Sequence, residues 1–249
     1  MMLTACLLLQ LAACAVPQPP WESYADFKDI NQLATDSAGR TIYGATNGGT
    51  FRFAAADTTL LGHATNLDGL PRIEASCVAV APDGRTWIGT TGGGIGWFSS
   101  AGGAAGVPIN GDAGLRSDTI LALLYYRSGT AERVVAGMPG GLALIDAADG
   151  SVLRNFYQSQ GYPVRRAVKA LALRHDSLWV GTDSGVAVAP MAGIYAAANW
   201  TSYTTIAGLS PDIRSLFATD TMIVAGTVNG AARWLSGPTW QRCGGIGGP

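Results

Sequence analysis

The stretch Asp83-Gly-Arg-Thr-Trp-Ile-Gly-Thr90 recurs in altered form along this chain of 249 residues, and its recurrence decides the fold. Its second glycine is predicted to have an equivalent in every unit. These glycines are Gly44, Gly89, Gly137, Gly181 and Gly226. They are 45, 48, 44 and 45 residues apart. Because self-similarity at a period of roughly 40–50 residues is typical of repeat architectures, we expect five similar structural units.

Each unit combines the same local signals. A Gly-Leu turn comes first, as at Gly69-Leu70, and an apolar pair three residues apart follows, as at Ile120 and Leu123. A polar turn such as Pro82-Asp-Gly84 then leads into a short run of β-branched and aromatic residues. Such runs, bounded by Gly, Asp and Ser, are typical of strands, here about four per unit. No stretch of the mature chain keeps a helical apolar period, so helices are not expected.

The apolar pair indicates sheets that are covered on both faces. Residues three apart in a strand point to opposite faces, so both faces of the first strand would be apolar. Four-stranded sheets packed radially against one another supply that cover. We therefore predict an all-β fold, a β-propeller of four-stranded blades. The five expected units span residues 21–61, 62–106, 107–155, 156–204 and 205–243.

Two segments have the pattern of an outermost strand that closes the ring. They are Trp21-Glu-Ser-Tyr24 and Trp240-Gln-Arg242. We expect Trp21–Tyr24 to complete a blade whose inner strands come from the far end of the chain. Either the ring closes with five blades and one surplus strand, or the chain is a fragment of a ring of about six to eight blades with an incomplete sixth. The second alternative is favoured because such repeats are expected in longer proteins.

Two blocks, Val78–Gly94 and Leu171–Gly185, resemble the two-component regulator propeller repeat. The blocks at 30–53 and 213–234 resemble it more weakly, and the third unit departs from it at Met138-Pro139. The resemblance covers roughly residues 21–243. It implies a propeller like those of periplasmic sensor regions in hybrid two-component kinases and of bacterial secretion machinery.

Composition narrows the classes of partner. The net charge is −1 and only 13% of the residues are charged, against about 25% in a typical globular protein. No cluster of Lys and Arg gives the basic patch that nucleic acid would need, so nucleic acid is not expected as a partner. The low charge and the 34 glycines fit an exported β-protein.

The N-terminal segment resembles a lipoprotein signal. The apolar stretch Leu3–Val16 is too short to span a bilayer as a helix. It ends in Leu11-Ala-Ala-Cys14, which resembles a bacterial lipoprotein cleavage box. The expected organisation is a signal peptide at 1–13, a Pro-rich tether at 14–20 and the propeller domain at 21–249. The resemblance implies lipidation of Cys14.

Localisation follows from this segment. Met1-Met2 carries no Lys or Arg, although signal peptides usually begin with positive charge, so ordinary secretion or another true start are alternatives. We expect a bacterial envelope protein, either an outer-membrane lipoprotein or a periplasmic or secreted one. Ala15 favours the outer membrane, since Asp at that position would favour inner-membrane retention in some bacteria.

The remaining cysteines do not suggest a disulfide framework. Cys77 is expected to be a small buried hydrophobic residue, at a strand position that the other units fill with Ile or Val. Cys243 lies in the tail. A Cys77–Cys243 disulfide is an alternative in an oxidising compartment.

No complete catalytic constellation is visible. His63 is expected in a polar connection and His175 in a turn, and neither has a partner at metal-ligand spacing. The turns at Asp36 and Asp83 are attributed to capping by the carboxylate. The residues expected nearest the ring axis are Gln32, Ala79, Ala122, Lys169 and Ser215, with no carboxylate among them. We therefore expect no catalytic residue, no metal and no cofactor.

Tryptophans recur at matched positions. Trp87 and Trp179 occupy equivalent places in second strands, and Trp21, Trp200 and Trp240 occupy similar positions in outer strands. Repetition at matched places favours packing between blades, where aromatic rings fill the widening space between sheets. Contact with carbohydrate is the alternative.

Basic residues lie just before or at the start of the innermost strands. These ring-face binding candidates are Lys28, Arg72, Arg116, Arg165, Arg166 and Arg214. In a propeller such loops converge on one face around the central opening. A rim that mixes Arg with Asp favours a protein or peptide partner, with a glycan as a further possibility and solvated loop charges as the simpler interpretation.

The sequence thus predicts a non-enzymatic envelope module for binding or sensing, which touches a membrane only through its N-terminal lipid anchor. Two alternatives stay open. One is a propeller enzyme, either a lyase or a glycoside-active protein. The other is a component of a bacterial secretion or assembly complex.

Overall fold

A computed structural model describes residues 27–100, 103, 106–164 and 167–244. Within these ranges the chain is all-β, with four short 3₁₀ turns and no α-helix, as the repeat pattern predicts. The first two sheets contain β1 (Ile30–Thr35), β2 (Thr41–Thr46), β3 (Gly49–Ala54) and β4 (Leu60–Ala64), then β5 (Ala75–Val80), β6 (Thr86–Thr90) and β7 (Ile95–Phe98). The third contains β8 (Ala122–Ser128), β9 (Ala131–Met138), β10 (Gly141–Asp146) and β11 (Val152–Phe156).

The remaining strands build the last two sheets. The fourth contains β12 (Val168–Arg174), β13 (Ser177–Thr182), β14 (Gly185–Pro190) and β15 (Thr201–Tyr203). The fifth contains β16 (Ile213–Ala218), β17 (Ile223–Thr227), β18 (Gly230–Trp234) and β19 (Gln241–Arg242). The turns are η1 (Asn66–Asp68), η2 (Gln158–Gln160), η3 (Met191–Gly193) and η4 (Ala197–Asn199).

Every sheet is antiparallel, and its strands pair in chain order. Four sheets have four strands, and the second has three among the described residues. There Ile109 forms an isolated bridge to Ile95, at the edge where a fourth strand would pair. The expected outer strand at the end of the chain is confirmed, because β19 pairs with β18. Trp21–Tyr24, the other expected outer strand, lies outside the described residues.

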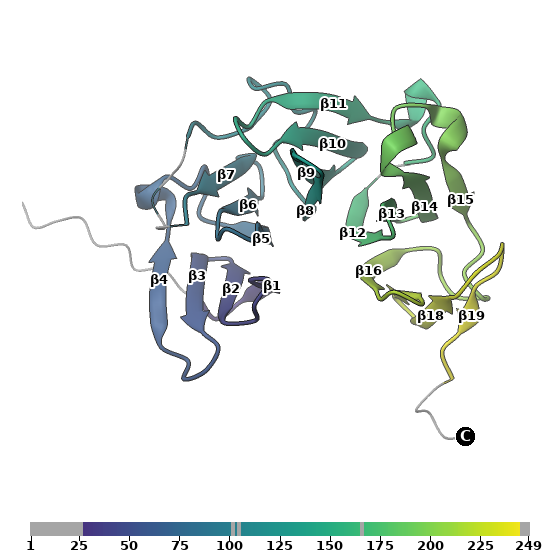
Figure 1. The fold of residues 1–249 in the computed structure, drawn as a ribbon, viewed down its shortest axis with the longest axis horizontal. Helices are drawn as coiled ribbons and strands as arrows, with labels where there is room; N and C mark the ends of the chain where they lie inside the picture. The colour runs from purple at the N-terminus through teal and green to yellow at the C-terminus, as the bar shows by residue number, and fades with distance from the viewer. Residues whose placement is uncertain (1–26, 101–102, 104–105, 165–166, 245–249) are drawn as a thin grey trace, which may run out of the picture.

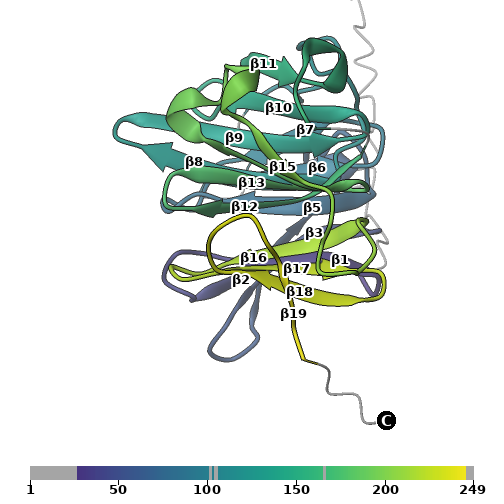
Figure 2. The ribbon, with the colours of Figure 1, turned by 90° about the vertical axis from the view of Figure 1, so that its right-hand side faces the viewer.

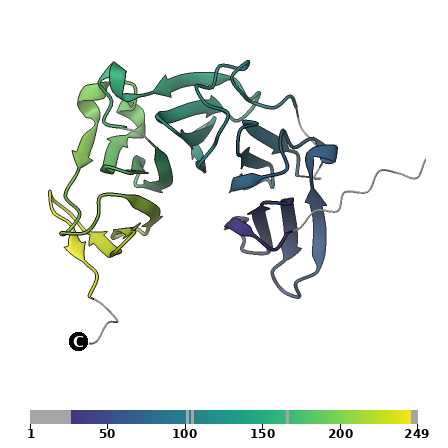
Figure 3. The ribbon, with the colours of Figure 1, turned by 180° about the vertical axis from the view of Figure 1, so that it is seen from behind.

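The five sheets stand side by side around an arc, with β1, β5, β8, β12 and β16 on the inside (Figure 1). Each first strand packs against the first strand of the next sheet. Seen from the side, the strands run across the thickness of the arc, so the connections between strands gather on its two opposite faces (Figure 2). The first and last sheets are separated by an opening, which is equally visible from behind (Figure 3). The architecture is therefore that of a β-propeller, and the described residues form an open arc rather than a closed five-bladed ring.

The core lies between the sheets. In the second sheet, Val78 and Ile88 pack toward the first sheet, whereas Trp87 and Ile95 pack toward the third. This alternation follows from the two-residue period of a strand. The sheets are thus apolar on both faces, and Trp87 and its equivalent Trp179 are buried between sheets. The apolar pair itself was placed wrongly, because Ile213 and Leu216 pack toward the same neighbouring sheet, with a bulge between them.

The strand register corrects the predicted repeat glycine of the first unit. Gly89 and Gly181 each pair with the residue that follows a bulge in the first strand, Cys77 or Ala170. In the first sheet that partner is Gln32, and it pairs with Ala45 rather than Gly44. The equivalent of the repeat glycine is therefore Ala45, and Gly44 precedes it by one position.

Hydroxyl groups support this assignment. Thr46 and Thr182 follow Ala45 and Gly181, and each donates from Oγ1 to the carbonyl that opens the next strand. The side chain of Ala45 fits because the neighbouring sheet presents the small Ala75 to this core, where the later sheets present Ile120, Val168 and Ile213. Size complementarity between sheets, which a single unit does not reveal, allows the substitution.

Cys77 is a buried residue, as predicted, but its equivalents differ from those expected. It pairs with Gly89, so it corresponds to Gln32, Ala122 and Ala170 rather than to an Ile or Val. Burial raises the pKa of its thiol to about 12. Cys77 and Cys243 are free cysteines, which contradicts the disulfide alternative.

The turns behave as their sequences predict. Gly69, Gly114 and Gly161 have positive φ within the connections between sheets, a conformation that glycine adopts without steric cost. Asp36 and Asp83 accept hydrogen bonds from the backbone N–H groups of Arg40 and Arg85. No helix among the described residues is long and apolar enough to cross a membrane.

Candidate functional site

Four of the first strands contain a β-bulge close to the point where the strand begins. The ladder registers shift between Ile30 and Gln32, Ala75 and Cys77, Val168 and Ala170, and Ile213 and Ser215. The extra residues are Asn31, Ser76, Lys169 and Arg214. Bulges redirect side chains out of the regular alternation. We call the face at which the first strands begin, with these bulge residues and the preceding connections, the inner rim.

The bulge residues link neighbouring sheets. Asn31 donates from Nδ2 to the Ala75 carbonyl at 2.8 Å, and Ser76 donates from Oγ to the Ile120 carbonyl at 2.6 Å. The acceptor residues, Ala75 and Ile120, occupy equivalent positions in the second and third sheets. Lys169 reaches the next sheet as well, because its Nζ lies 2.6 Å from Asp212 Oδ1. A polar side chain therefore joins each of three pairs of sheets at the rim.

Asp212 is a carboxylate of the inner rim that pairs with two cations. It accepts a hydrogen bond from Lys169 and forms a second ion pair with Arg214, whose Nη2 lies 2.9 Å from Oδ2. The hydrogen bond from Lys169, aided by the two positive charges, lowers the pKa of Asp212. The carboxylate is thus held in its charged form, as a structural partner of two cations.

The prediction of which residues lie nearest the ring axis is only partly correct. Gln32 accepts a hydrogen bond from the Val78 backbone N–H, so its side chain faces the second sheet. Ala79 and Ala122 are buried between sheets. The rim mixes Asp with basic side chains, as expected, because Lys169 and Arg214 hold Asp212 there.

The predicted basic residues lie at this face but do not form one cluster. Arg72, just before β5, lies over a glycine turn, where a Cβ on Gly93 would stand 2.7 Å from Arg72 Cγ. Arg116 places its guanidinium 4.1 Å from the centroid of the Tyr157 ring. Arg214 is brought together with Asp212. Lys28 is exposed just before β1. Arg165 and Arg166 lie outside the described residues.

Arg116 opens onto a groove of about 310 Å³ at the outer side of the third sheet. Arg154 of β11, Tyr157 and Gln160 also line it. Arg116 and Arg154 form no ion pair within the described part of the chain. The groove is polar and shallow, and its two guanidinium groups suit the carboxylates of a partner.

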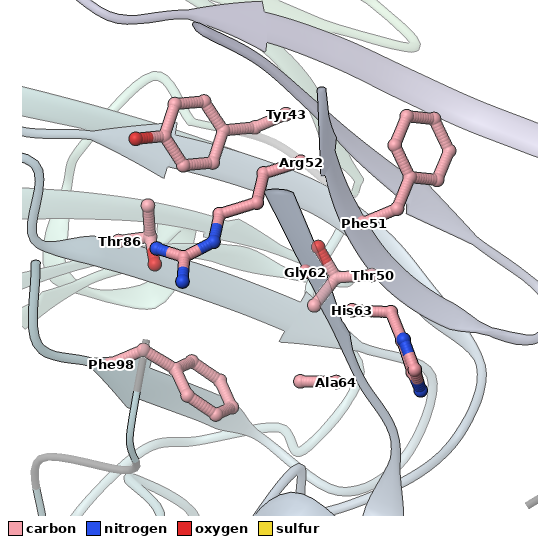
Figure 4. Close-up of a pocket in the computed structure, with 9 residues that line it drawn as sticks. All are labelled: Tyr43, Thr50, Phe51, Arg52, Gly62, His63, Ala64, Thr86 and Phe98. Carbon is pink, nitrogen blue, oxygen red and sulfur yellow. The ribbon is translucent and has the colours of Figure 1, made fainter. Parts of the chain in front are cut away.

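Another cavity, of about 50 Å³, lies between the first and second sheets. Figure 4 shows the Arg52 side chain extending toward Thr86 between Tyr43 and Phe98, while His63 points away from it. His63 corrects an expectation, because it lies in β4 opposite Phe51 rather than in a connection. His175 lies in a turn, as predicted, with positive φ. Among the described residues, no group of three or more His, Cys, Asp and Glu is placed to hold a metal ion.

The sequence pattern missed Asn31 and Ser76 as rim residues. A signal was present, since a polar residue follows the first apolar residue of the strand in Ile30-Asn31, Ala75-Ser76, Val168-Lys169 and Ile213-Arg214. In a regular strand that residue would simply face the opposite side. Only the ladder register shows that it is an extra residue in a bulge.

Neither a protein-family model nor a curated protein matches the sequence. Solved structures do resemble the fold. The extracellular domain of the hybrid two-component system protein BT3049 from B. thetaiotaomicron is 21% identical, with a TM-score of 0.68. The alignment covers 82% of this chain and 27% of that one.

Two further structures show the same architecture. PorZ, a surface component of the type-IX secretion system of Porphyromonas gingivalis, is 16% identical with a TM-score of 0.63, over 86% of this chain and 28% of that one. The WD40 repeats of RRP9 are 16% identical with a TM-score of 0.67, and the alignment covers 86% of this chain and 63% of that one. The chain therefore spans about a quarter of the length of the two bacterial proteins. At these identities the likeness establishes the fold alone.

Proposed function

We propose that this chain is a non-enzymatic binding or sensing module of a bacterial cell envelope, and that its inner rim receives a protein or peptide partner. The observation that carries the proposal is the set of exposed guanidinium groups at one face, from Arg72, Arg116 and Arg214. Arg is enriched in protein interfaces, where its planar fork pairs with carboxylates and carbonyls. The likeness to extracellular sensor domains and to a secretion component supports the location.

Cross-linking in envelope extract, with the sites read by mass spectrometry, tests this proposal. The wild-type chain is expected to cross-link one partner through the inner rim. Arg72→Gln/Arg116→Gln should lower the yield by about ten-fold or more, because hydrogen bonds to charged groups contribute ~1.5–3 kcal/mol each. Arg40→Gln, an exposed change at the opposite end of the first sheet, should have no effect. Cross-links that map to the opposite face, or that the double variant leaves unchanged, contradict the proposal.

The proposal includes the absence of enzymatic activity. Its support is the position of the two histidines, because His63 lies in the first sheet and His175 in the fourth, at the turn between β12 and β13. A lyase would need such a group beside a carboxylate or a metal. Turnover of a polysaccharide by the wild-type chain, lost in His63→Ala/His175→Ala, would show an enzyme instead.

We infer in addition that the end faces of the arc pack against further sheets, in a ring of more than five blades. Ile30 and Leu33 in the first sheet are 52% and 54% exposed, whereas Ile120, Val168 and Ile213, the equivalents of Ile30, are fully buried. At the other end Phe217 is 65% exposed. Exposed apolar sheet faces of this kind promote association.

Sedimentation of this chain tests the inference about the end faces. The wild-type chain is expected to self-associate with increasing concentration, because each end face is an uncovered apolar surface. Leu33→Glu should reduce the association and leave the thermal midpoint within about 2 °C, since Leu33 is exposed. A monomer at every concentration, with or without the substitution, would contradict it.

A further inference from the structure

β11 is the outer strand of the third sheet, and one of its edges is open. It pairs with β10 on one side, and no strand within the described ranges pairs with it on the other. Figure 1 shows β11 at the outer border of the arc. The outer strands β15 and β19 have only three and two residues, whereas β4 and β11 have five each. Short edge strands are a common protection against pairing with other chains, and β11 is not protected in this way.

The groove of about 310 Å³ lies along this open edge. We call it the β11 groove. Its lining consists of four residues of β11 and four residues of the connections before β8 and β12, namely Val152–Asn155, Gly114, Arg116, Tyr157 and Gln160. Both connections precede first strands and so belong to the inner rim. The groove therefore leads from the inner rim along the edge of β11.

The charged groups of the β11 groove are two accessible guanidinium groups. Arg116 and Arg154 are both exposed, and the described lining contains no Asp or Glu. The guanidinium of Arg116 lies 4.1 Å from the centroid of the Tyr157 ring. A guanidinium that stacks through its flat face keeps its N–H edge available for a carboxylate. The groove therefore favours an acidic ligand.

The two arginines stand on opposite faces of β11. Arg154 pairs with Leu144, which belongs to the core between the third and fourth sheets. The next residue, Asn155, faces the other way because side chains alternate along a strand. Asn155 donates from Nδ2 to the Gly114 carbonyl at 2.9 Å, so the connection that carries Arg116 is bound to the Asn155 face. A ligand that meets both arginines must present acidic groups to both faces.

The rest of the lining suits a peptide backbone with apolar side chains. Leu153 is the extra residue of a bulge and is 40% exposed, and the half-buried Val152 precedes it. Because a bulge interrupts the ladder, a further strand would pair with residues 154–156 and set an apolar side chain against Leu153. Gln160 is exposed and offers both an amide donor and an acceptor.

We propose that the β11 groove binds an extended acidic segment of a partner protein as an added strand on the edge of β11. In this mode main-chain hydrogen bonds supply affinity and alternate side chains supply specificity. Two adjacent acidic residues would direct one carboxylate toward Arg154 and the other toward Arg116. An acidic sugar would satisfy the guanidinium groups but not the strand edge. The inference rests on the proposed function, since Arg116 belongs to the inner rim, and it names the chemistry of the partner segment.

Fluorescence anisotropy of labelled hexapeptides tests the proposal. Thr-Val-Glu-Glu-Val-Thr is expected to bind about five-fold more tightly than Thr-Glu-Val-Glu-Val-Thr, which has the same composition but places both carboxylates on one face of the strand. Arg116→Gln and Arg154→Gln should each lower the affinity for the first peptide about five-fold, because each removes one exposed ion pair. Arg242→Gln, a matched change of an exposed arginine in the outer strand of the fifth sheet, should leave the affinity unchanged.

A second peptide tests the strand pairing without any change in the protein. N-methylation of both glutamates in Thr-Val-Glu-Glu-Val-Thr removes an N–H from each edge of the peptide strand, because adjacent residues direct their N–H groups to opposite edges. The methylated peptide keeps both carboxylates and is expected not to bind. Equal binding of the methylated and unmethylated peptides would show that the groove takes carboxylates without strand addition, and would overturn the proposal.

Three other results would overturn it. They are equal affinity for the two isomeric peptides, no binding of either at millimolar concentration, and binding that Arg116→Gln/Arg154→Gln does not weaken. Binding of glucuronate that this double variant blocks, without binding of either peptide, would assign the groove to an acidic sugar. Arg72→Gln lies outside the groove and should not affect the peptide. If cross-links form at the inner rim but the peptide does not bind, the added strand is wrong and the proposed function stands.

Discussion

Gly181 of β13 lies directly against Ile213 of the fifth sheet, and a Cβ on the glycine would stand 2.6 Å from Ile213 Cγ2. Gly89 has the same relation to Ile120, at 2.7 Å. A Cβ atom is essentially never found within 3.0 Å of a non-bonded atom, so alanine would not fit at these positions. The glycines therefore allow neighbouring sheets to pack close to each other. The spacing between sheets thus depends on the absence of a side chain on one of them.

Gly181→Ala is therefore expected to lower the free energy of unfolding by about 1–3 kcal/mol, the usual cost of overpacking a core. Ala45→Gly, the reverse change at the equivalent position of the first sheet, should cost about 1 kcal/mol or less, because it removes one methyl group. Urea unfolding of both variants measures the difference. Equal or greater stability of Gly181→Ala would show that the sheets can separate without cost.

Tyr125 is expected to stabilise the contact between the second and third sheets through its ring. Tyr125→Ala should lower the free energy of unfolding by about 3 kcal/mol, because it uncovers Trp87 and leaves a cavity. Tyr125→Phe should cost less, about 1 kcal/mol, because it keeps the ring that stacks on Trp87 and removes only the hydroxyl. Thermal unfolding of the two variants distinguishes ring packing from hydroxyl bonding, and a larger loss in Tyr125→Phe would reverse the assignment.

The ion pair of Lys169 and Asp212 is expected to contribute stability that depends on pH. Its hydrogen bond lowers the pKa of Asp212 below 3.8, the ordinary value that the unfolded chain keeps. A depressed folded pKa gives stability that is present above the unfolded value and is lost as the pH falls through the folded value. Lys169→Met should therefore cost about 0.5–1 kcal/mol near pH 6 and less below pH ~4. A difference between the two proteins that is the same at pH 6 and pH ~3 would contradict this origin.

Cys14 is predicted from the sequence to carry the lipid anchor. Cys14→Ala should move the protein from the membrane fraction to the soluble fraction when it is expressed in a bacterial host with residues 1–20 intact. Two acyl chains suffice for stable anchoring, at ~0.8 kcal/mol per buried CH₂, so the shift should be nearly complete. Intact-mass spectrometry supplies the second measurement. A free Cys14 thiol on an uncleaved chain, or cleavage elsewhere, would refute the lipoprotein prediction.

Local sequence signals predicted the units and their turns. The period of the glycines, the strand runs and the capping carboxylates act within a few residues, so each can be recognised in one unit. The positive φ of Gly69, the turn at Asp83 and the burial of Trp87 were all foreseeable for this reason. The basic character of the inner rim was also visible, since it depends on which residues precede the first strands.

Tertiary structure decided what depends on two units at once. A bulge is defined by a register between strands, so Asn31 and Ser76 could not be distinguished from ordinary strand residues. The place of Ala45 depends on the size of Ala75 in the next sheet. The exposure of Ile30 depends on whether another sheet covers it. The sequence by itself determined the repeating sheet, whereas contacts between sheets decided the register, the rim and the cavity, because packing is a property of pairs of surfaces.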